Sequence, residues 1–342
     1  MKVLYINYIF QKGHINFDHI HIDALIRQAT EVKLVLHKDI AMQLPYPPQQ
    51  YALIIPSFFN YDSTKGFVNR FFYLITLMYI KIHLSFKRYD KVILSSLDEI
   101  TLGMIPLCSG MNIICHDNGR NLGKGLKGFF LKNLSKRNSF LVFNEQMSKP
   151  FLHQGCRFHI VSHGCILPNI KKDYDHLPID ISSFKTIIYH PSNRPNKRFF
   201  EKLEEDKDFL SFLEENSILL ILRSTTVKDN VTKNFVFINH YLNPSEYQSL
   251  FHHSDIILMA YPEDFSCRVS GVSFECVSNK KRALVKDNLS LRYCRDFFNY
   301  DPIFTDTQQL KERIKFLINH PEATCIATPE NLYPDYKLVL TQ

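Results

Sequence analysis

The chain has 342 residues, of which 45% are hydrophobic and 22% are charged. This length is too great for one ordinary core and fits two domains of about 150 residues each, and the apolar content excludes wholesale disorder. The net charge of +7 is concentrated in the N-terminal half, where a basic surface is a candidate contact for lipid, phosphorylated substrate or nucleic acid.

Short apolar runs alternate with helix-length segments from the N-terminus onward. A first strand is predicted within residues 1–10, and further strands are predicted at 32–37, 51–56, 91–96, 111–116, 139–144 and 158–163. Helices are predicted at 17–30, 66–87 and 125–137. Strands that alternate with helices indicate a parallel sheet covered by helices on both faces. Residues 1–165 are therefore predicted to be an α/β, Rossmann-like domain.

The alternation stops at residues 166–184, which contain two prolines and several acidic residues and are predicted to be an interdomain linker. It then resumes with strands at 185–190, 217–223, 234–240, 254–260 and 282–287 and with helices at 198–215, 244–252, 272–278 and 307–319. Residues 185–328 are predicted to be a second Rossmann-like domain. Residues 329–342 form a tail that is long enough to cross back to the first domain.

The N-terminus carries a short apolar run without a small-residue cleavage site, which is untypical of a signal peptide. The most apolar long stretch, 71–80, is too short to span a bilayer. The eight cysteines lack metal-ligand spacing, and the spacing of His14, His19 and His21 does not define a metal site. We expect a cytoplasmic protein with reduced thiols and without a metal or other cofactor.

The basic excess is densest in residues 120–137, where six Lys and Arg residues alternate with Leu and Phe and no acidic residue occurs. A basic amphipathic segment of this kind is typical of proteins that lie on anionic lipid. It is also compatible with a solvated helix face. Contact with an anionic membrane at the inner face of the plasma membrane is the prediction for 120–137, whereas nucleic acid is not expected as a partner.

Open parallel sheets bind ligands at the carboxyl ends of their strands. In residues 254–287 a strand, a polar loop and a helix start follow one another. Free backbone N–H groups at a helix start bind anions, and Arg268 stands next to them as a further phosphate donor. Glu275 follows one helical turn later, where its carboxylate can accept from two adjacent ribose hydroxyls. The helix-start residues are Ser270, Gly271 and Val272.

This stretch resembles the donor-site motif of retaining, family-4-like GT-B glycosyltransferases, which bind a nucleotide sugar between two Rossmann-like domains. The resemblance places Glu275 at the family's second glutamate and implies that it binds the nucleotide ribose. The first glutamate, eight residues earlier in the family, is replaced by Cys267. Recognition of the donor sugar is therefore expected to differ, with Glu263 or Asp264 as substitutes.

The same resemblance implies roles elsewhere. Arg194 and Lys197, with Arg198 as an alternative, follow the strand at 185–190 and are expected to face the donor diphosphate. The loop at 239–243 is expected to lie at the nucleobase; its site candidates are Asn239, His240 and Leu242. In the first domain, His116 is expected near the donor sugar, and Gly13 and His14 are expected near the acceptor.

Glycosyl transfer releases a nucleoside diphosphate, so cations and a helix N-terminus must stabilise the developing charge when no metal does so. An inverting enzyme also needs a base on the acceptor hydroxyl, for which His116 and Asp117 are the candidates. The resemblance, together with the basic first domain, therefore implies a hexosyltransferase-type enzyme that acts on a glycan or lipid-linked acceptor in the synthesis of capsule or lipopolysaccharide. The alternative is a non-catalytic protein of the same fold that binds a sugar nucleotide or polysaccharide. A dehydrogenase is not supported because the first strand is not followed by GxGxxG.

Overall fold

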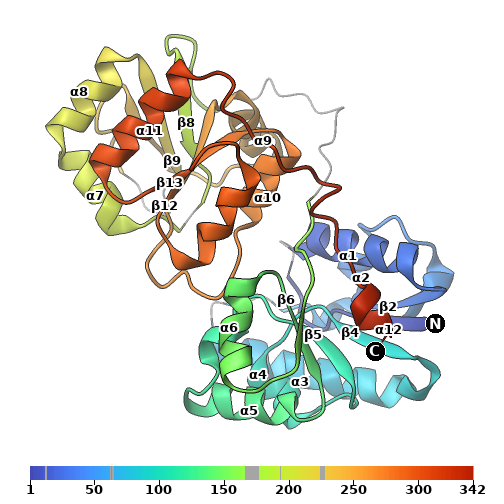
Figure 1. Ribbon diagram of the computed structural model, residues 1–342. Helices are drawn as coiled ribbons and strands as arrows, with labels where there is room; N and C mark the ends of the chain where they lie inside the picture. Colours follow the sequence, from blue (N-terminus) through green and yellow to red (C-terminus); the bar gives the residue numbers. More distant parts are fainter. Residues whose placement is uncertain are drawn as a thin grey trace. The chain divides into compact units, whose positions relative to one another are not determined.

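The computed structural model describes residues 1–11, 14–61, 63, 65–165, 177–192, 194–223 and 228–341. The chain divides into two compact units, each built around its own sheet (Figure 1). The first unit contains residues 1–164 together with 332–342, and the second contains residues 165–331. Most of the predicted linker, residues 166–176, lies outside the described ranges.

The first unit contains a seven-stranded parallel sheet with the strand order β3-β2-β1-β4-β5-β6-β7. Its strands are β1 (Lys2–Ile6), β2 (Glu31–His37), β3 (Tyr51–Ile55), β4 (Lys91–Leu94), β5 (Met111–Ile114), β6 (Ser139–Val142) and β7 (Phe158–Ile160). The β-branched and leucine-rich runs that predict the five inner strands are largely buried on both faces, as a helix-covered parallel sheet requires, whereas the edge strands β3 and β7 are partly exposed.

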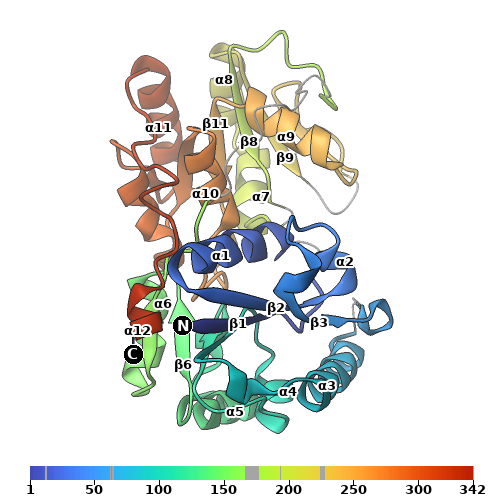
Figure 2. The ribbon, with the colours of Figure 1, turned by 90° about the vertical axis from the view of Figure 1, so that its right-hand side faces the viewer.

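Helices cover both faces of this sheet. They are α1 (Ile15–Gln28), α2 (Lys38–Ala41), α3 (Gly66–His83), α4 (Glu99–Met104), α5 (Gly125–Ser135) and α6 (Glu145–His153). Figures 1 and 2 show α1 and α2 on one face and α3, α4 and α5 side by side on the other. This division follows from right-handed crossovers, because the chain runs outward from β1 to β3 and then in the opposite direction from β4 to β7.

The second unit contains a six-stranded parallel sheet with the order β10-β9-β8-β11-β12-β13. Its strands are β8 (Thr186–His190), β9 (Ile218–Arg223), β10 (Phe235–Ile238), β11 (Ile256–Met259), β12 (Arg282–Lys286) and β13 (Ile303–Phe304). Its helices are α7 (Lys197–Glu205), α8 (Lys207–Glu215), α9 (Pro244–His253), α10 (Gly271–Ser278) and α11 (Thr307–Asn319). The order places the carboxyl ends of β8, β9 and β11 side by side at the centre of the sheet.

The prediction of a single helix at 198–215 is wrong, because the segment forms two helices, α7 and α8. Asp206 interrupts it. Its backbone is extended, with φ −79° and ψ 96°, and its side chain accepts a hydrogen bond from the Phe209 amide at 3.0 Å. An aspartate that caps a new helix in this way cannot continue the previous one.

The C-terminal segment belongs to the first unit, where α12 (Lys337–Thr341) lies. Tyr336 is fully buried, and its hydroxyl lies 2.6 Å from Nδ1 of His21. Gln28 fixes the same segment through its side chain, which accepts from the Tyr336 amide at 2.7 Å and donates to the Pro334 carbonyl at 2.9 Å.

Among the helices in the described ranges, none combines the length and the apolar character that crossing a bilayer requires.

Candidate functional site

The N-terminus of α10 lies beyond the end of β11, where the sequence predicts the anion site. Ser270 is buried and is held from two sides: its Oγ lies 2.6 Å from the Tyr261 hydroxyl, and its backbone N–H donates to the Tyr293 hydroxyl at 3.0 Å. The helix has no side-chain cap and no acidic residue in its first turn. Gly271 is exposed, and a Cβ built on it would meet nothing within 4 Å. The start of this helix is therefore open to an anionic ligand.

Glu275 lies one turn further along α10 and is held by a neighbour from α9. Its Oε2 accepts a hydrogen bond from the Tyr247 hydroxyl at 2.7 Å. Burial and then the charge of Glu275 raise the pKa of Tyr247 well above its ordinary value, so Tyr247 is a protonated donor at neutral pH. The contact fixes one carboxylate oxygen of Glu275 and ties α9, which follows the predicted nucleobase loop, to α10.

The loop before α10 departs from the family pattern in its backbone as well as in its side chain. Cys267, which stands at the position of the family's first glutamate, has φ +53°, a left-handed conformation that is uncommon for residues other than glycine. The guanidinium carbon of Arg268 lies 5.0 Å from the centre of the Phe265 ring. Glu263 and Asp264 are both exposed.

The loop after β8 is attached to the end of β11. Asn196 accepts from the Phe199 amide and thereby caps α7, while its side-chain amide donates to the Tyr261 carbonyl at 3.1 Å. Arg194 and Lys197 are exposed at this loop and at the first position of α7. Their position after β8 agrees with the predicted one; their contact with a diphosphate stays a prediction.

Arg223, which the sequence reasoning missed, is a further cation at the same edge of the sheet. It is the last residue of β9, its Nη1 donates to the Pro191 carbonyl at 3.2 Å, and its guanidinium carbon lies 6.0 Å from the centre of the Tyr247 ring. It therefore lies between the end of β8 and the tyrosine that holds Glu275. Its place as the last residue of a predicted strand was a signal that could have identified it.

His190, at the end of β8, is fully buried, and its Nδ1 lies 2.8 Å from the Leu258 carbonyl oxygen. Because a carbonyl only accepts, Nδ1 carries the proton and Nε2 is left with a lone pair. Burial lowers the pKa of His190 to about 4, which keeps the ring neutral at pH 7. Within the described ranges Nε2 has no hydrogen-bond partner, and neither does the buried hydroxyl oxygen of Tyr189.

Hydrogen bonds hold the predicted nucleobase loop in a defined conformation. Asn239 is exposed, and its side chain accepts from the Lys228 amide at 3.0 Å and donates to the Lys228 carbonyl at 2.7 Å. His240 is also exposed, whereas Leu242 is buried. The loop leads into α9 through a capping box formed by Asn243 and Glu246.

At the corresponding edge of the first sheet, the structure brings His14 and His116 together. Their ring centroids lie 4.7 Å apart. His116 Nε2 lies 3.0 Å from the Ser95 carbonyl oxygen, so Nε2 carries the proton and Nδ1 is left as the basic nitrogen. Burial lowers the pKa of His116 to about 4, and burial followed by the neighbouring His116 lowers the pKa of His14 to about 3. The predicted acceptor residue Gly13 lies outside the described ranges.

His21 and His163, which were not among the predicted site residues, lie next to this pair. The ring of Phe17 lies 4.8 Å from His116, 5.2 Å from His163 and 4.1 Å from His21. Burial lowers the pKa of His163 to about 4 and that of His21 well below its ordinary value. The group is therefore a cluster of neutral imidazoles, which accept and donate hydrogen bonds without carrying charge.

Asp18 is the centre of a buried hydrogen-bond network next to this cluster. Its buried carboxylate accepts hydrogen bonds from the Tyr5 hydroxyl at 2.7 Å, from the Asn7 amide at 2.7 Å and from Ser95 Oγ at 2.6 Å. Ser95 also supplies the carbonyl that fixes His116. The network thus sets the orientation of His116 through a residue at the end of β4.

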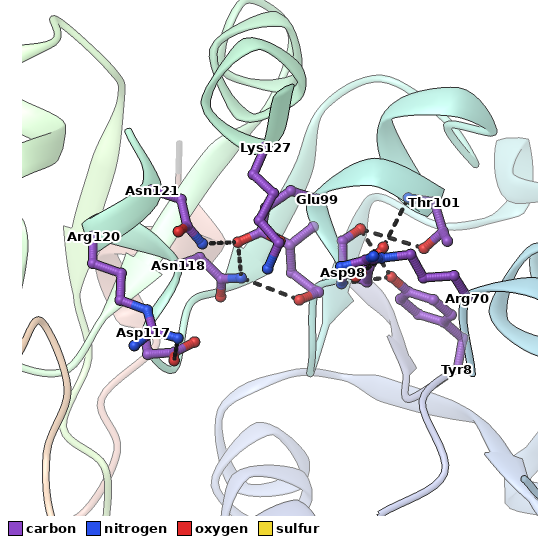
Figure 3. Close-up of polar contacts among 11 residues, drawn as sticks. Tyr8, Arg70, Asp98, Glu99, Thr101, Asp117, Asn118, Arg120, Asn121 and Lys127 are labelled. Carbon is purple, nitrogen blue, oxygen red and sulfur yellow. Dashed lines mark hydrogen bonds and ion pairs between the residues drawn. The ribbon is translucent and has the colours of Figure 1, made fainter. Parts of the chain in front are cut away.

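Asp117, the other base candidate, is paired: its Oδ2 lies 3.1 Å from Arg120 Nη2 (Figure 3). Next to this pair, Glu99 is buried at 2% exposure and accepts from the side-chain amides of Asn118 and Asn121, each at 2.7 Å. Asp117 is therefore engaged by a guanidinium, whereas Nδ1 of His116 is the basic nitrogen of its ring.

Within the described part of the chain, no group of three or more His, Cys, Asp or Glu side chains has the geometry of a metal site. His19 faces outward and lies 3.3 Å from Asp23, whereas His21 faces the core. His19 therefore points away from the cluster that contains His14 and His21.

No protein-family model matches the sequence, and no characterised protein matches it at a significant level. Several solved structures are similar to this chain. A UDP-forming α,α-trehalose-phosphate synthase from Burkholderia xenovorans superposes with a TM-score of 0.61 over 94% of this chain and 92% of its own, at 9% identity. The lipopolysaccharide outer core galactosyltransferase WaaB in its apo form gives 0.56 over 98% and 96%, at 10% identity.

A third similar structure is the UDP-GlcNAc 2-epimerase from Neisseria meningitidis bound to UDP-GlcNAc, with a TM-score of 0.56 over 94% of this chain and 92% of its own, at 13% identity. The likeness covers nearly the whole chain in each case. It confirms the predicted α/β architecture of two Rossmann-like domains, the GT-B fold. At these identities the likeness concerns the fold alone.

Proposed function

We propose that the protein is a glycosyltransferase that moves a sugar from a nucleoside-diphosphate sugar to a glycan or lipid-linked acceptor in the synthesis of a cell-envelope polysaccharide or lipopolysaccharide. The observation that carries the proposal is the arrangement around α10. An uncapped helix N-terminus lies one turn from a glutamate that Tyr247 holds in place. A helix start binds a diphosphate, and a fixed carboxylate one turn away accepts from a ribose.

In this proposal each residue has a defined part. The amides of Gly271 and Val272 bind the diphosphate, and Arg223, Arg194 and Lys197 balance the negative charge that grows as the nucleoside diphosphate leaves. For an inverting transfer, His116 in the first unit accepts the proton of the acceptor hydroxyl at Nδ1. Its low pKa, about 4, keeps that nitrogen unprotonated at neutral pH.

The structural neighbours support the donor class. One is a UDP-forming synthase, one is a lipopolysaccharide galactosyltransferase and one was solved with UDP-GlcNAc. The replacement of the family's first glutamate by Cys267 is the observation that favours the second candidate, a protein that binds the nucleotide sugar without turnover.

A thermal-shift panel of UDP, GDP, ADP, CMP and dTDP tests the proposal. A ligand at 100 times its dissociation constant stabilises the folded state by about 2.7 kcal/mol, so one base is expected to raise the melting temperature well above the others. Glu275→Gln is expected to lose most of this shift, whereas Glu201→Gln, an exposed glutamate on α7, retains it. Stabilisation by none of the nucleotides would contradict the proposal.

Turnover separates the two candidate functions. A glycosyltransferase releases the nucleoside diphosphate from the matching nucleotide sugar when membrane glycolipids are supplied, and His116→Asn slows this release without weakening nucleotide binding. Nucleotide binding without any release in the presence of such acceptors would favour the non-catalytic candidate.

A further inference from the structure

Helix α3 carries an apolar stripe on its solvent side. Phe67, Phe71, Met78 and Ile82 are 82%, 58%, 48% and 75% exposed. At about 100° per residue these four positions fall within roughly 60° of the helix circumference. The opposite side of the helix is buried, at Thr76, Leu77 and Ile80. Helix α3 therefore has two apolar faces, whereas a surface helix normally has one apolar face and one polar face.

The exposed apolar surface extends over the neighbouring helices. Met104 of α4 is 56% exposed, and Leu126 and Phe129 of α5 are 61% and 60% exposed. Helix α4 contacts both α3 and α5, and Figure 2 shows the three helices in one layer over the same face of the first sheet. We refer to the outer side of α3, α4 and α5 as the α3–α5 face.

The α3–α5 face is also basic. Residues 65–88 and 118–137 contain no acidic residue. Six lysines in these segments are exposed: Lys65, Lys81, Lys87, Lys124, Lys132 and Lys136.

Three acidic residues in or next to this layer are paired with cations. Asp98 lies 3.2 Å from Arg70, Glu99 lies 3.6 Å from Lys127, and Asp117 lies 3.1 Å from Arg120, as Figure 3 shows for the residues around α4. These pairs remove the negative charges and leave the exposed lysines in excess.

We propose that the α3–α5 face binds the surface of an anionic lipid bilayer, with the stripe of α3 in the interfacial region and the lysines at the headgroups. Apolar side chains beside lysines are the features that hold peripheral proteins in that region. This proposal goes beyond the proposed function: it extends the membrane contact predicted for 120–137 to three helices and assigns the apolar part of it to α3. A second copy of the chain is a poorer occupant, because a two-fold contact would bring like-charged lysines together.

Vesicle sedimentation tests the proposal with the full chain. Wild-type protein is expected to bind phosphatidylcholine vesicles that contain phosphatidylglycerol and to bind pure phosphatidylcholine weakly. Replacing Phe67, Phe71, Met78 and Ile82 by Ser is expected to lower the partition coefficient by roughly tenfold or more. Lys124→Gln, Lys132→Gln and Lys136→Gln combined are expected to remove the preference for the anionic lipid. The matched control is Ile26→Ser with Met42→Ser, two exposed residues on the opposite face of the sheet, which should bind like the wild type.

A fluorescence measurement reports the position of α3 directly. The chain contains no tryptophan, so Phe71→Trp introduces a single probe. Its emission is expected to shift to shorter wavelengths on anionic vesicles, whereas that of Met42→Trp stays unchanged. An unshifted emission of Phe71→Trp in vesicle-bound protein would overturn the proposal. Binding to duplex DNA in place of vesicles would also overturn it, as would a dimer of the wild type that becomes monomeric in the four-serine variant. Vesicle binding without nucleotide binding would leave this proposal standing and refute the proposed function.

Discussion

The hydroxyl of Tyr247 donates to Oε2 of Glu275 across a distance of 2.7 Å. The contact joins the helix that follows the predicted nucleobase loop to the helix whose N-terminus is open to an anion. It fixes the carboxylate that is proposed to hold the ribose before any nucleotide arrives.

Tyr247→Phe removes this hydrogen bond and leaves the ring in place. Nucleoside diphosphate affinity is expected to fall roughly three- to tenfold because the carboxylate is no longer held, and the free energy of unfolding is expected to fall by about 1 kcal/mol. Calorimetric titration with the nucleotide that stabilises the wild type most, together with urea unfolding, measures both. An unchanged affinity would show that the orientation of Glu275 does not matter for the nucleotide.

Arg223→Gln removes the guanidinium at the end of β9. Because a charged hydrogen bond to phosphate contributes about 1.5–3 kcal/mol, affinity for the nucleoside diphosphate is expected to fall by roughly one to two orders of magnitude. Affinity for the unphosphorylated nucleoside should not change. Lys202→Gln, an exposed cation on α7, serves as the control for net charge. Equal losses for nucleoside and nucleotide would mean that Arg223 acts on the fold.

Stability is expected to decrease in acid. The pKa values of His116, His163 and His190 lie at about 4 in the folded protein because the rings are buried. The ordinary value is about 6.5, so the unfolded chain takes up protons first as the pH falls from about 6.5 to about 4, and the folded state loses a few kcal/mol in that window. The buried Asp18, whose pKa is raised, opposes this loss in part.

Urea unfolding between pH 8 and pH 4 measures the effect. The free energy of unfolding of the wild type is expected to be flat above pH 7 and to fall below about pH 6.5. His116→Asn is expected to flatten the slope, because one buried imidazole no longer has to stay neutral. An identical slope in the variant would mean that His116 is solvated in the folded protein.

Asp18→Asn tests the network beneath the histidines. An amide cannot accept from Tyr5, Asn7 and Ser95 together, so one buried donor loses its partner and stability is expected to fall by about 1–3 kcal/mol. Tyr5→Phe removes one donor and leaves the carboxylate with two, so its loss is expected to be smaller. Asp18 would not be the centre of the network if the two variants lost equal stability.

Most of the fold could be predicted from the sequence because hydrophobic periodicity and composition are local signals. The strand predicted at 282–287 is β12 (Arg282–Lys286), and the helix predicted at 307–319 has the observed bounds. The six-residue helix α4 was missed because fewer than two turns give too few apolar repeats to define a period, and α6 was missed because Pro150, a residue that normally interrupts a helix, lies inside it. The split at Asp206 depends on one side-chain cap within an otherwise regular pattern.

The candidate site was predicted only in part. Strand-end position pointed to His116, and the motif pointed to Glu275, but their partners come from distant positions in the chain. Tyr247 precedes Glu275 by 28 residues, and the Tyr336 that contacts His21 follows it by 315. Such partners are set by how helices pack on the sheet, for which one sequence contains no local signal.

The most direct test of the account is a crystal structure of the protein with the nucleoside diphosphate that stabilises it most. The account predicts the diphosphate within hydrogen-bonding distance of the Gly271 and Val272 amides, with the ribose hydroxyls on Glu275 and with Arg223 close to the phosphates. A nucleotide bound elsewhere, with the N-terminus of α10 unoccupied, would contradict it.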